Sequence, residues 1–197
     1  MLINPSELLK TANSVTINYT SEMRYTYNMS YFDTNEIIDK MIVKFTKNAN
    51  IPIKILPFTS NINYIVPRLV HSILEEKWIE IPVTSNFKNK INYYSTFFHE
   101  LIHAVDAIGK SYDVRRKENN NLTLFAKEEL IAETGSLLLL NHFNFITDEI
   151  PMVTLMYLQC WVQRYKMYSN TQMTLTKYKK EVFPEAKKRV NELLAYA

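Results

Sequence analysis

The chain has 197 residues, of which 47% are hydrophobic and 22% are charged. These proportions are ordinary for a folded protein and exclude disorder along the whole chain. The length fits one domain with a sizeable core, and two domains are not expected. The formal net charge of +3 is too small to indicate nucleic-acid binding by itself.

The cysteine count and the N-terminus bear on the compartment in which the chain works. Cys160 is the only cysteine and lies in an apolar run, so we expect a buried thiol and no intramolecular disulfide. The first residues lack a basic stretch followed by an apolar one, so no signal peptide is expected. Because the longest uninterrupted apolar run, 137–140, is too short to cross a bilayer, we predict a cytoplasmic protein without a membrane partner.

The composition of the chain changes at about residue 33. Residues 1–33 are rich in Ser, Thr, Asn and Tyr, with a short helix expected at 5–12 and weak alternation at 15–19. An arm, an edge strand and a partner-binding segment all fit this stretch, and the pattern does not choose between them. We therefore predict an N-terminal arm or extension, 1–33, followed by one main domain, 34–197.

Three regular elements are expected at the start of the main domain. A cap at Thr34 or Asn35 starts a helix whose apolar residues recur at helical spacing and which should end near residues 48–50. Residues 51–57 and 77–82 alternate, so each predicts a strand, and the prolines around the first place it near a sheet edge. A strand directly before the next helix could hold an extended peptide beside that helix.

The segment 94–106 contains the pattern His-Glu-x-x-His in an apolar helical run. His99 and His103 are four residues apart, so they lie one turn apart on the same helix face, where both rings can bind one zinc ion. Glu100 is offset by one position and can accept a proton from water that zinc activates. A chance match is expected roughly once in a couple of hundred chains of this length.

A candidate for the third metal ligand follows the polar stretch 111–122, which we expect to be a loop. The next segment, 124–138, predicts a helix with Glu129 and Glu133 on one face. A catalytic zinc site needs a third protein ligand, and Glu129 can supply it if this helix turns back against the zinc helix. Glu128 is the alternative ligand, and Glu133 can accept the other ring N–H of one histidine.

The remaining segments predict packing helices. Gly135 inside a helix costs about 1 kcal/mol relative to alanine. A close contact with another helix, which leaves no room for a side chain, would explain a glycine at this position. Residues 148–168 form an amphipathic core segment, and the last helix, 176–196, carries many lysines. A solvated face explains those lysines better than a nucleic-acid patch does, although both fit. The weak candidates for contacting the substrate or transition state are Tyr112, Arg115 and His142.

Several of these segments together resemble one known family. The matching residues are Ile81-Pro82, Phe87, Tyr93-Tyr94, Phe98 to His103, Arg115-Arg116, Ala126 to Glu133, Tyr157 to Trp161 and the lysine-rich last helix. In combination they resemble the zincin-like metallopeptidase domain of ArdC-type antirestriction proteins, from about Phe32 to the end. The resemblance implies a helix-rich α+β zincin-like fold with a small β-sheet preceding the His-Glu-x-x-His helix.

The resemblance also implies a function. It suggests a zinc-dependent metallopeptidase acting on a protein or peptide, with Glu100 as general base, encoded by a phage, plasmid or other mobile element. Full-length family members carry an N-terminal single-stranded-DNA-binding domain, for which residues 1–33 are too few. The alternative is an antirestriction or accessory protein that binds single-stranded DNA or a host protein on a zincin scaffold. A zinc-stabilised structural domain is a third alternative.

Overall fold

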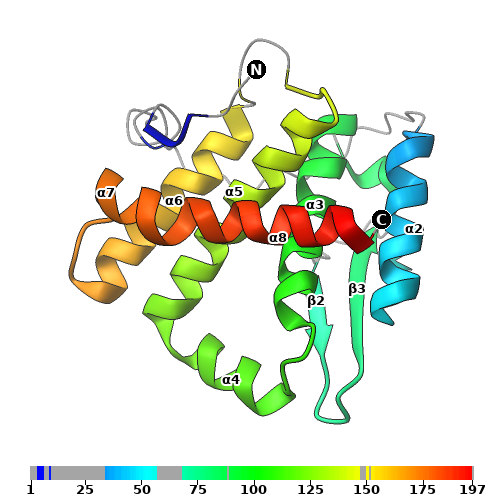
Figure 1. Ribbon diagram of the computed structural model, residues 1–197, viewed down its shortest axis with the longest axis horizontal. Helices are drawn as coiled ribbons and strands as arrows, with labels where there is room; N and C mark the ends of the chain where they lie inside the picture. The colour runs from blue at the N-terminus through cyan, green and yellow to red at the C-terminus, as the bar shows by residue number, and fades with distance from the viewer. Residues whose placement is uncertain are drawn as a thin grey trace.

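The computed structural model describes residues 4–6, 9, 34–56, 68–87, 89–146, 150 and 152–196. Its elements, in chain order, are α2 (Glu36–Ala49), β1 (Ile53–Leu56), β2 (Arg68–His71), β3 (Lys77–Pro82), the 3-10 turn η1 (Thr84–Asn86), α3 (Lys90–Ala107), α4 (Tyr112–Asn120), α5 (Leu122–His142), α6 (Met152–Ser169), α7 (Leu175–Lys177), the π-helical segment η2 (Tyr178–Val182) and α8 (Phe183–Tyr196). Figure 1 shows a helix-rich molecule with its small sheet at one side, in agreement with the predicted α+β fold.

Helix α2 begins and ends where the sequence predicts. The Asn35 side chain caps it by accepting hydrogen bonds from two backbone N–H groups of the first turn, and Asn50 ends it in a left-handed conformation with φ of 52°. Tyr94 of α3 fixes the start of α2, because its hydroxyl donates to Asp39 and accepts from the backbone N–H of Asn35. The helix is thereby anchored to the helix that carries the His-Glu-x-x-His motif.

The sheet has the order β1-β3-β2, with β1 parallel and β2 antiparallel to β3. Both predicted strands are confirmed as β1 and β3, and β1 lies at an edge as expected. Strand β3 directly precedes α3, and it is central in the sheet, so it is not the edge strand beside that helix. This edge is β2, a strand of four residues for which the sequence predicts no element.

Helix α3 is the centre of the fold. Most of its residues are buried, because α5, α8 and the strands β2 and β3 all contact it. The α5 contact is close enough for the Ser136 hydroxyl to donate to the backbone oxygen of Ser95 at 2.6 Å. In Figure 1, α8 crosses in front of α3 and α5, and it contacts both helices.

The expected loop at 111–122 is wrong, because residues Tyr112–Asn120 form helix α4. The Ser111 side chain caps this helix at the N–H of Val114, and Asp113 lies in its first turn, where its negative charge is favourable. No residue of α4 is buried. A helix without an apolar face leaves no hydrophobic periodicity in the sequence, which explains the error.

The remaining predicted segments are helical with shifted bounds. Helix α5 is longer than the predicted 124–138, α6 corresponds to 148–168, and the last helix, expected at 176–196, is divided into α7, η2 and α8. Cys160 is buried, as expected. Residues 10–33 of the proposed arm lie outside the described residues, and the division at residue 33 stays a prediction. Within the described ranges, no helix is both long and apolar enough to span a bilayer.

Gly135 confirms the predicted close contact between α5 and α3. A Cβ at this position would lie 2.7 Å from Cγ1 and 2.8 Å from Cδ1 of Ile102, distances that real contacts do not reach. Ile102 is fully buried and has little space in which to move. The absent side chain therefore sets how near the two helices approach.

We predict that Gly135→Ala destabilises the protein. Overpacking costs about 1–3 kcal/mol, and the higher helix propensity of alanine offsets about 1 kcal/mol of it. Urea unfolding measures the change. In an Ile102→Ala background, the same substitution should be neutral or stabilising, since the obstructing atoms are gone. Stabilisation by Gly135→Ala in the wild-type background would contradict the close contact.

Candidate metal centre

Three predicted ligands converge where α3 meets α5. His99 and His103 project from one face of α3, and their Nε2 atoms lie 3.0 Å apart. Glu129 of α5 reaches both rings, with Oε2 3.3 Å from Nε2 of His99 and Oε1 3.5 Å from Nε2 of His103. Among the described residues, this is the group of His, Cys, Asp and Glu side chains whose donor atoms are placed to hold one metal ion.

The donor set fits a divalent metal. In a tetrahedral site with metal–ligand bonds near 2.0–2.1 Å, neighbouring ligand atoms are about 3.3 Å apart. The separations between the two Nε2 atoms and the Glu129 oxygens, 3.0–3.5 Å, lie around this value. Two imidazoles and one carboxylate also form a ligand set typical of catalytic zinc sites with one position left for water.

A second carboxylate lies behind each histidine ring. Glu133 Oε1 is 3.2 Å from Nδ1 of His99, an ion-pair distance without hydrogen-bond geometry, so acceptance of the ring N–H by Glu133 stays a prediction. Glu128 Oε1 is 3.2 Å from Nδ1 of His103, so Glu128 lies behind a ligand instead of replacing Glu129 at the metal position. Carboxylates at these positions favour the tautomer with hydrogen on Nδ1, which leaves Nε2 to face the metal.

These carboxylates also change the charge state of the rings. Burial lowers the pKa of His99, but Glu133 and Glu129 outweigh it, so the pKa is raised above the ordinary 6.5. Burial likewise lowers the pKa of His103, and Glu129 and Glu128 raise it further than burial lowers it. Because the Nε2 atoms are 3.0 Å apart, at most one hydrogen can lie between them. In the metal-free protein, the two rings together therefore carry one proton more than two neutral imidazoles, and this proton lies between the two Nε2 atoms.

Glu100, the predicted general base, is held at the edge of the sheet. Its side chain is buried, and Oε2 accepts a hydrogen bond of 2.7 Å from the backbone N–H of Leu69 in β2. This bond fixes the carboxylate on the β2 side of α3. The site thus lies between α5, which supplies Glu129, and the edge strand, which orients Glu100.

The structure does not bring the three weaker candidates into this centre. The Arg115 guanidinium is paired with Asp106 at 2.6 Å. The Tyr112 ring packs edge to face on the ring of His71, with 5.9 Å between their centroids. His142 ends α5, thirteen residues after Glu129, which corresponds to about 20 Å along the helix axis. None of these contacts supports a role at the metal.

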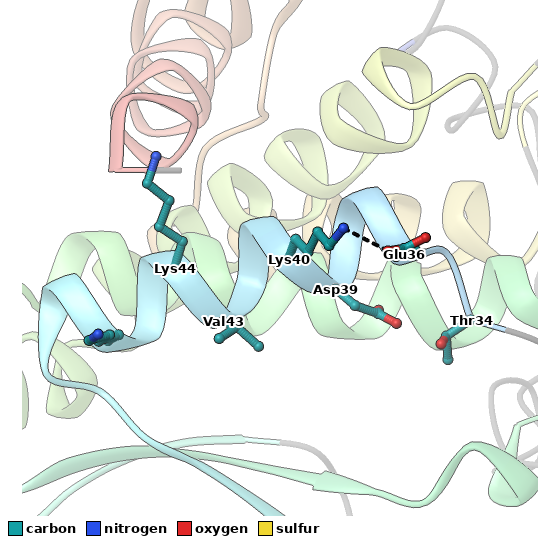
Figure 2. Close-up of a pocket in the computed structure, with 7 residues that line it drawn as sticks. Thr34, Glu36, Asp39, Lys40, Val43 and Lys44 are labelled. Atoms are coloured by element: carbon teal, nitrogen blue, oxygen red, sulfur yellow. Dashed lines mark ion pairs between the residues drawn. The ribbon is translucent and has the colours of Figure 1, made fainter.

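A separate surface pocket of about 540 Å³ lies along α2 and contains none of the ligands. Figure 2 shows Asp39, Val43 and Thr34 on one side of the helix and the Lys40–Glu36 ion pair on another. Apart from half-buried Asp39, its lining is exposed. The pocket is therefore a surface depression outside the metal centre. Its lining residues are Thr34, Glu36, Asp39, Lys40, Val43, Lys44 and Lys47.

Sequence reasoning assigned the lysines of the last helix to a solvated face and did not single out Arg189 on the same helix. This side chain is only 5% exposed and forms ion pairs with Glu128 and Asp106. A signal was present in the sequence, because Arg189 lies at helical spacing from Ala186 and Leu193, both of which are fully buried. A basic residue within an apolar stripe indicates a buried partner.

Comparison with known proteins assigns the family. Residues 69–176, more than half of the chain, match the family described as zincin-like metallopeptidase. The chain therefore belongs to the zincin-like metallopeptidase family, which confirms the resemblance and the fold predicted from the sequence and implies a divalent metal. No curated protein matches the chain.

One solved structure similar to this chain is the Mn(II)-bound crystal structure of the antirestriction protein ArdC from plasmid R388. The two share 22% sequence identity with a TM-score of 0.44, and the match covers 83% of this chain and 54% of that one. The chain thus spans about half the length of that protein.

We predict that metal binding weakens as the pH falls. The histidines bind metal only when neutral, and both have a pKa raised above 6.5, so the metal must displace at least one proton. The zinc dissociation constant should rise about tenfold per displaced proton between about pH 7.5 and about pH 6.5. Competition with a chromophoric chelator of known pH dependence measures this. Equal constants at the two pH values would show that no proton is displaced.

Proposed function

We propose that the chain is a zinc-dependent metallopeptidase. The observation that carries this proposal is the placement of a base beside a ligand set: His99, His103 and Glu129 converge on one point, and Glu100 lies one position from His99 on the same helix. A purely structural zinc site does not need the glutamate in the second position of the motif. Zinc is the metal that this ligand set most often holds in hydrolytic sites.

The residues divide the reaction between them. Zinc at such a site acts as a Lewis acid and lowers the pKa of water. His99, His103 and Glu129 hold the metal, while Glu133 and Glu128 fix the ring orientations. Glu100 accepts the proton of the attacking water and later donates it to the leaving amine. Its Oε2 is occupied by the N–H of Leu69, so the other carboxylate oxygen serves for proton transfer.

The edge strand β2 supports a peptide as the substrate class. It is an edge in the order β1-β3-β2, and its residue Leu69 contacts Glu100 directly. An extended peptide can pair with an edge strand through backbone hydrogen bonds, which would place a peptide carbonyl beside the base and the metal. We therefore propose β2, in place of the strand directly before α3, as the strand that pairs with the peptide.

The proposal predicts different outcomes for two substitutions. Glu100→Gln should retain zinc but lose hydrolysis by about 10²–10⁴-fold, because the amide cannot accept the proton. Glu129→Ala should lose both zinc and hydrolysis, because two histidines alone are a weak set. Elemental analysis measures the metal, and cleavage of fluorescein-labelled casein and of a mixed peptide library measures activity.

A matched control is Glu36→Gln, which changes an exposed glutamate that pairs with Lys40 on α2. This variant should keep both zinc and cleavage. Undiminished hydrolysis by Glu100→Gln would refute the proposed base. Absence of zinc from the wild-type protein under metal-replete conditions would refute the catalytic centre altogether.

Binding of single-stranded DNA is the alternative function. The supporting observation is that four lysines of the last helical region are exposed: Lys179, Lys180, Lys187 and Lys188. If they form a binding surface, a labelled oligothymidine should bind at low salt, bind more weakly as salt rises, and bind equally to Glu100→Gln. No retention at low salt would remove this alternative. An origin on a mobile element stays a prediction.

A further inference from the structure

The side chain of Arg189 connects α8 with α5 and α3, the two helices that carry the predicted metal ligands. It lies on α8 and is 5% exposed. Its guanidinium binds both oxygens of Glu128 on α5, with Nη2 2.9 Å from Oε2, and Nη2 also lies 2.8 Å from Oδ1 of Asp106 on α3. The remaining Nε donates to Glu185 on its own helix at 3.1 Å. A guanidinium bound in this way has a fixed position, and so has the carboxylate that it holds.

Glu128 transmits this position to a metal ligand. The oxygen that Arg189 Nη1 contacts, Oε1, is the same atom that lies 3.2 Å from Nδ1 of His103. Without the arginine, the Glu128 carboxylate would lose both of its guanidinium contacts, and it would no longer have a fixed position beside Nδ1 of His103.

We propose that Arg189 is a positioning residue of the metal centre: it holds Glu128 against Nδ1 of His103 and so keeps Nε2 of that ring directed at the metal. This inference rests on the proposed metal site and deepens it. The residue touches neither metal nor substrate, and it acts from a helix that begins more than fifty residues after Glu129. The final helix is thereby part of the metal centre.

The test compares two arginines that share one partner, the buried Arg189 and the half-buried Arg115. Arg115 pairs with Asp106 at 2.6 Å, as Arg189 does, but Arg115 has no contact with Glu128 among the interactions of the described residues. Both Arg189→Met and Arg115→Met should lower the melting temperature of the metal-free protein. Arg189→Met should in addition weaken zinc binding about 10–100-fold, while Arg115→Met should change it less than about threefold. Competition with a chromophoric chelator measures the zinc dissociation constant.

A double-mutant cycle identifies the route through Glu128. In a Glu128→Gln background, the zinc affinity should already be reduced, and adding Arg189→Met should weaken it by no more than about threefold further. Arg189→Lys keeps the charge but not the two-pronged contact, and it should fall between wild type and Arg189→Met. This variant also serves if Arg189→Met does not fold.

Three results would each have a different consequence. Wild-type zinc affinity in folded Arg189→Met or Arg189→Lys, with only the melting temperature lowered, would overturn the positioning role and leave the metal site intact. Full additivity of Arg189→Met and Glu128→Gln would overturn the route through Glu128. Absence of zinc binding by the wild-type chain would instead refute the proposed function on which this inference rests.

Discussion

The structure depends on balancing negative charge that is buried between α3 and α5. Glu129 and Glu133 reach the histidine rings from one side of α5, and Glu128 reaches them from the next position. Carboxylates removed from water are costly unless cations or hydrogen bonds compensate them. The centre has two places where positive charge can enter. Arg189 occupies one, and the position enclosed by the ligand atoms of His99, His103 and Glu129 fits a divalent metal.

The helix contact around Gly135 makes this balance geometrically possible. The side chain of Glu129 is short compared with the usual distance between two packed helix axes, about 8–10 Å. A glycine facing Ile102 allows α5 to approach α3 closely, about 1.7 turns from Glu129. Packing and metal binding are therefore linked. A methyl group added at position 135 would push α5 away from α3, and Glu129 would move away from His99 and His103.

The parts of the site that could be predicted from sequence are those set by local periodicity. The positions of His99, Glu100 and His103 follow from helix geometry, and Glu129 follows from one helix turning back on another. Elements without a local signal were missed. Strand β2 has four residues and is defined by its pairing with β3, and α4 has no apolar face. The role of Arg189 depends on partners more than sixty positions away, which no spacing rule predicts.

The number of residues in the π-helical segment η2 determines the direction in which the side chains of α8 point. Such a segment accommodates one more residue than an α-helix of the same rise, and every residue after it is turned by about 100° relative to an uninterrupted helix. Removing one residue from Tyr178–Val182 would leave a continuous helix but would rotate Arg189 away from Glu128. Along this helix, single-residue insertions and deletions therefore have a larger effect than most substitutions, and homologous chains should keep the number of residues between η2 and Arg189 constant.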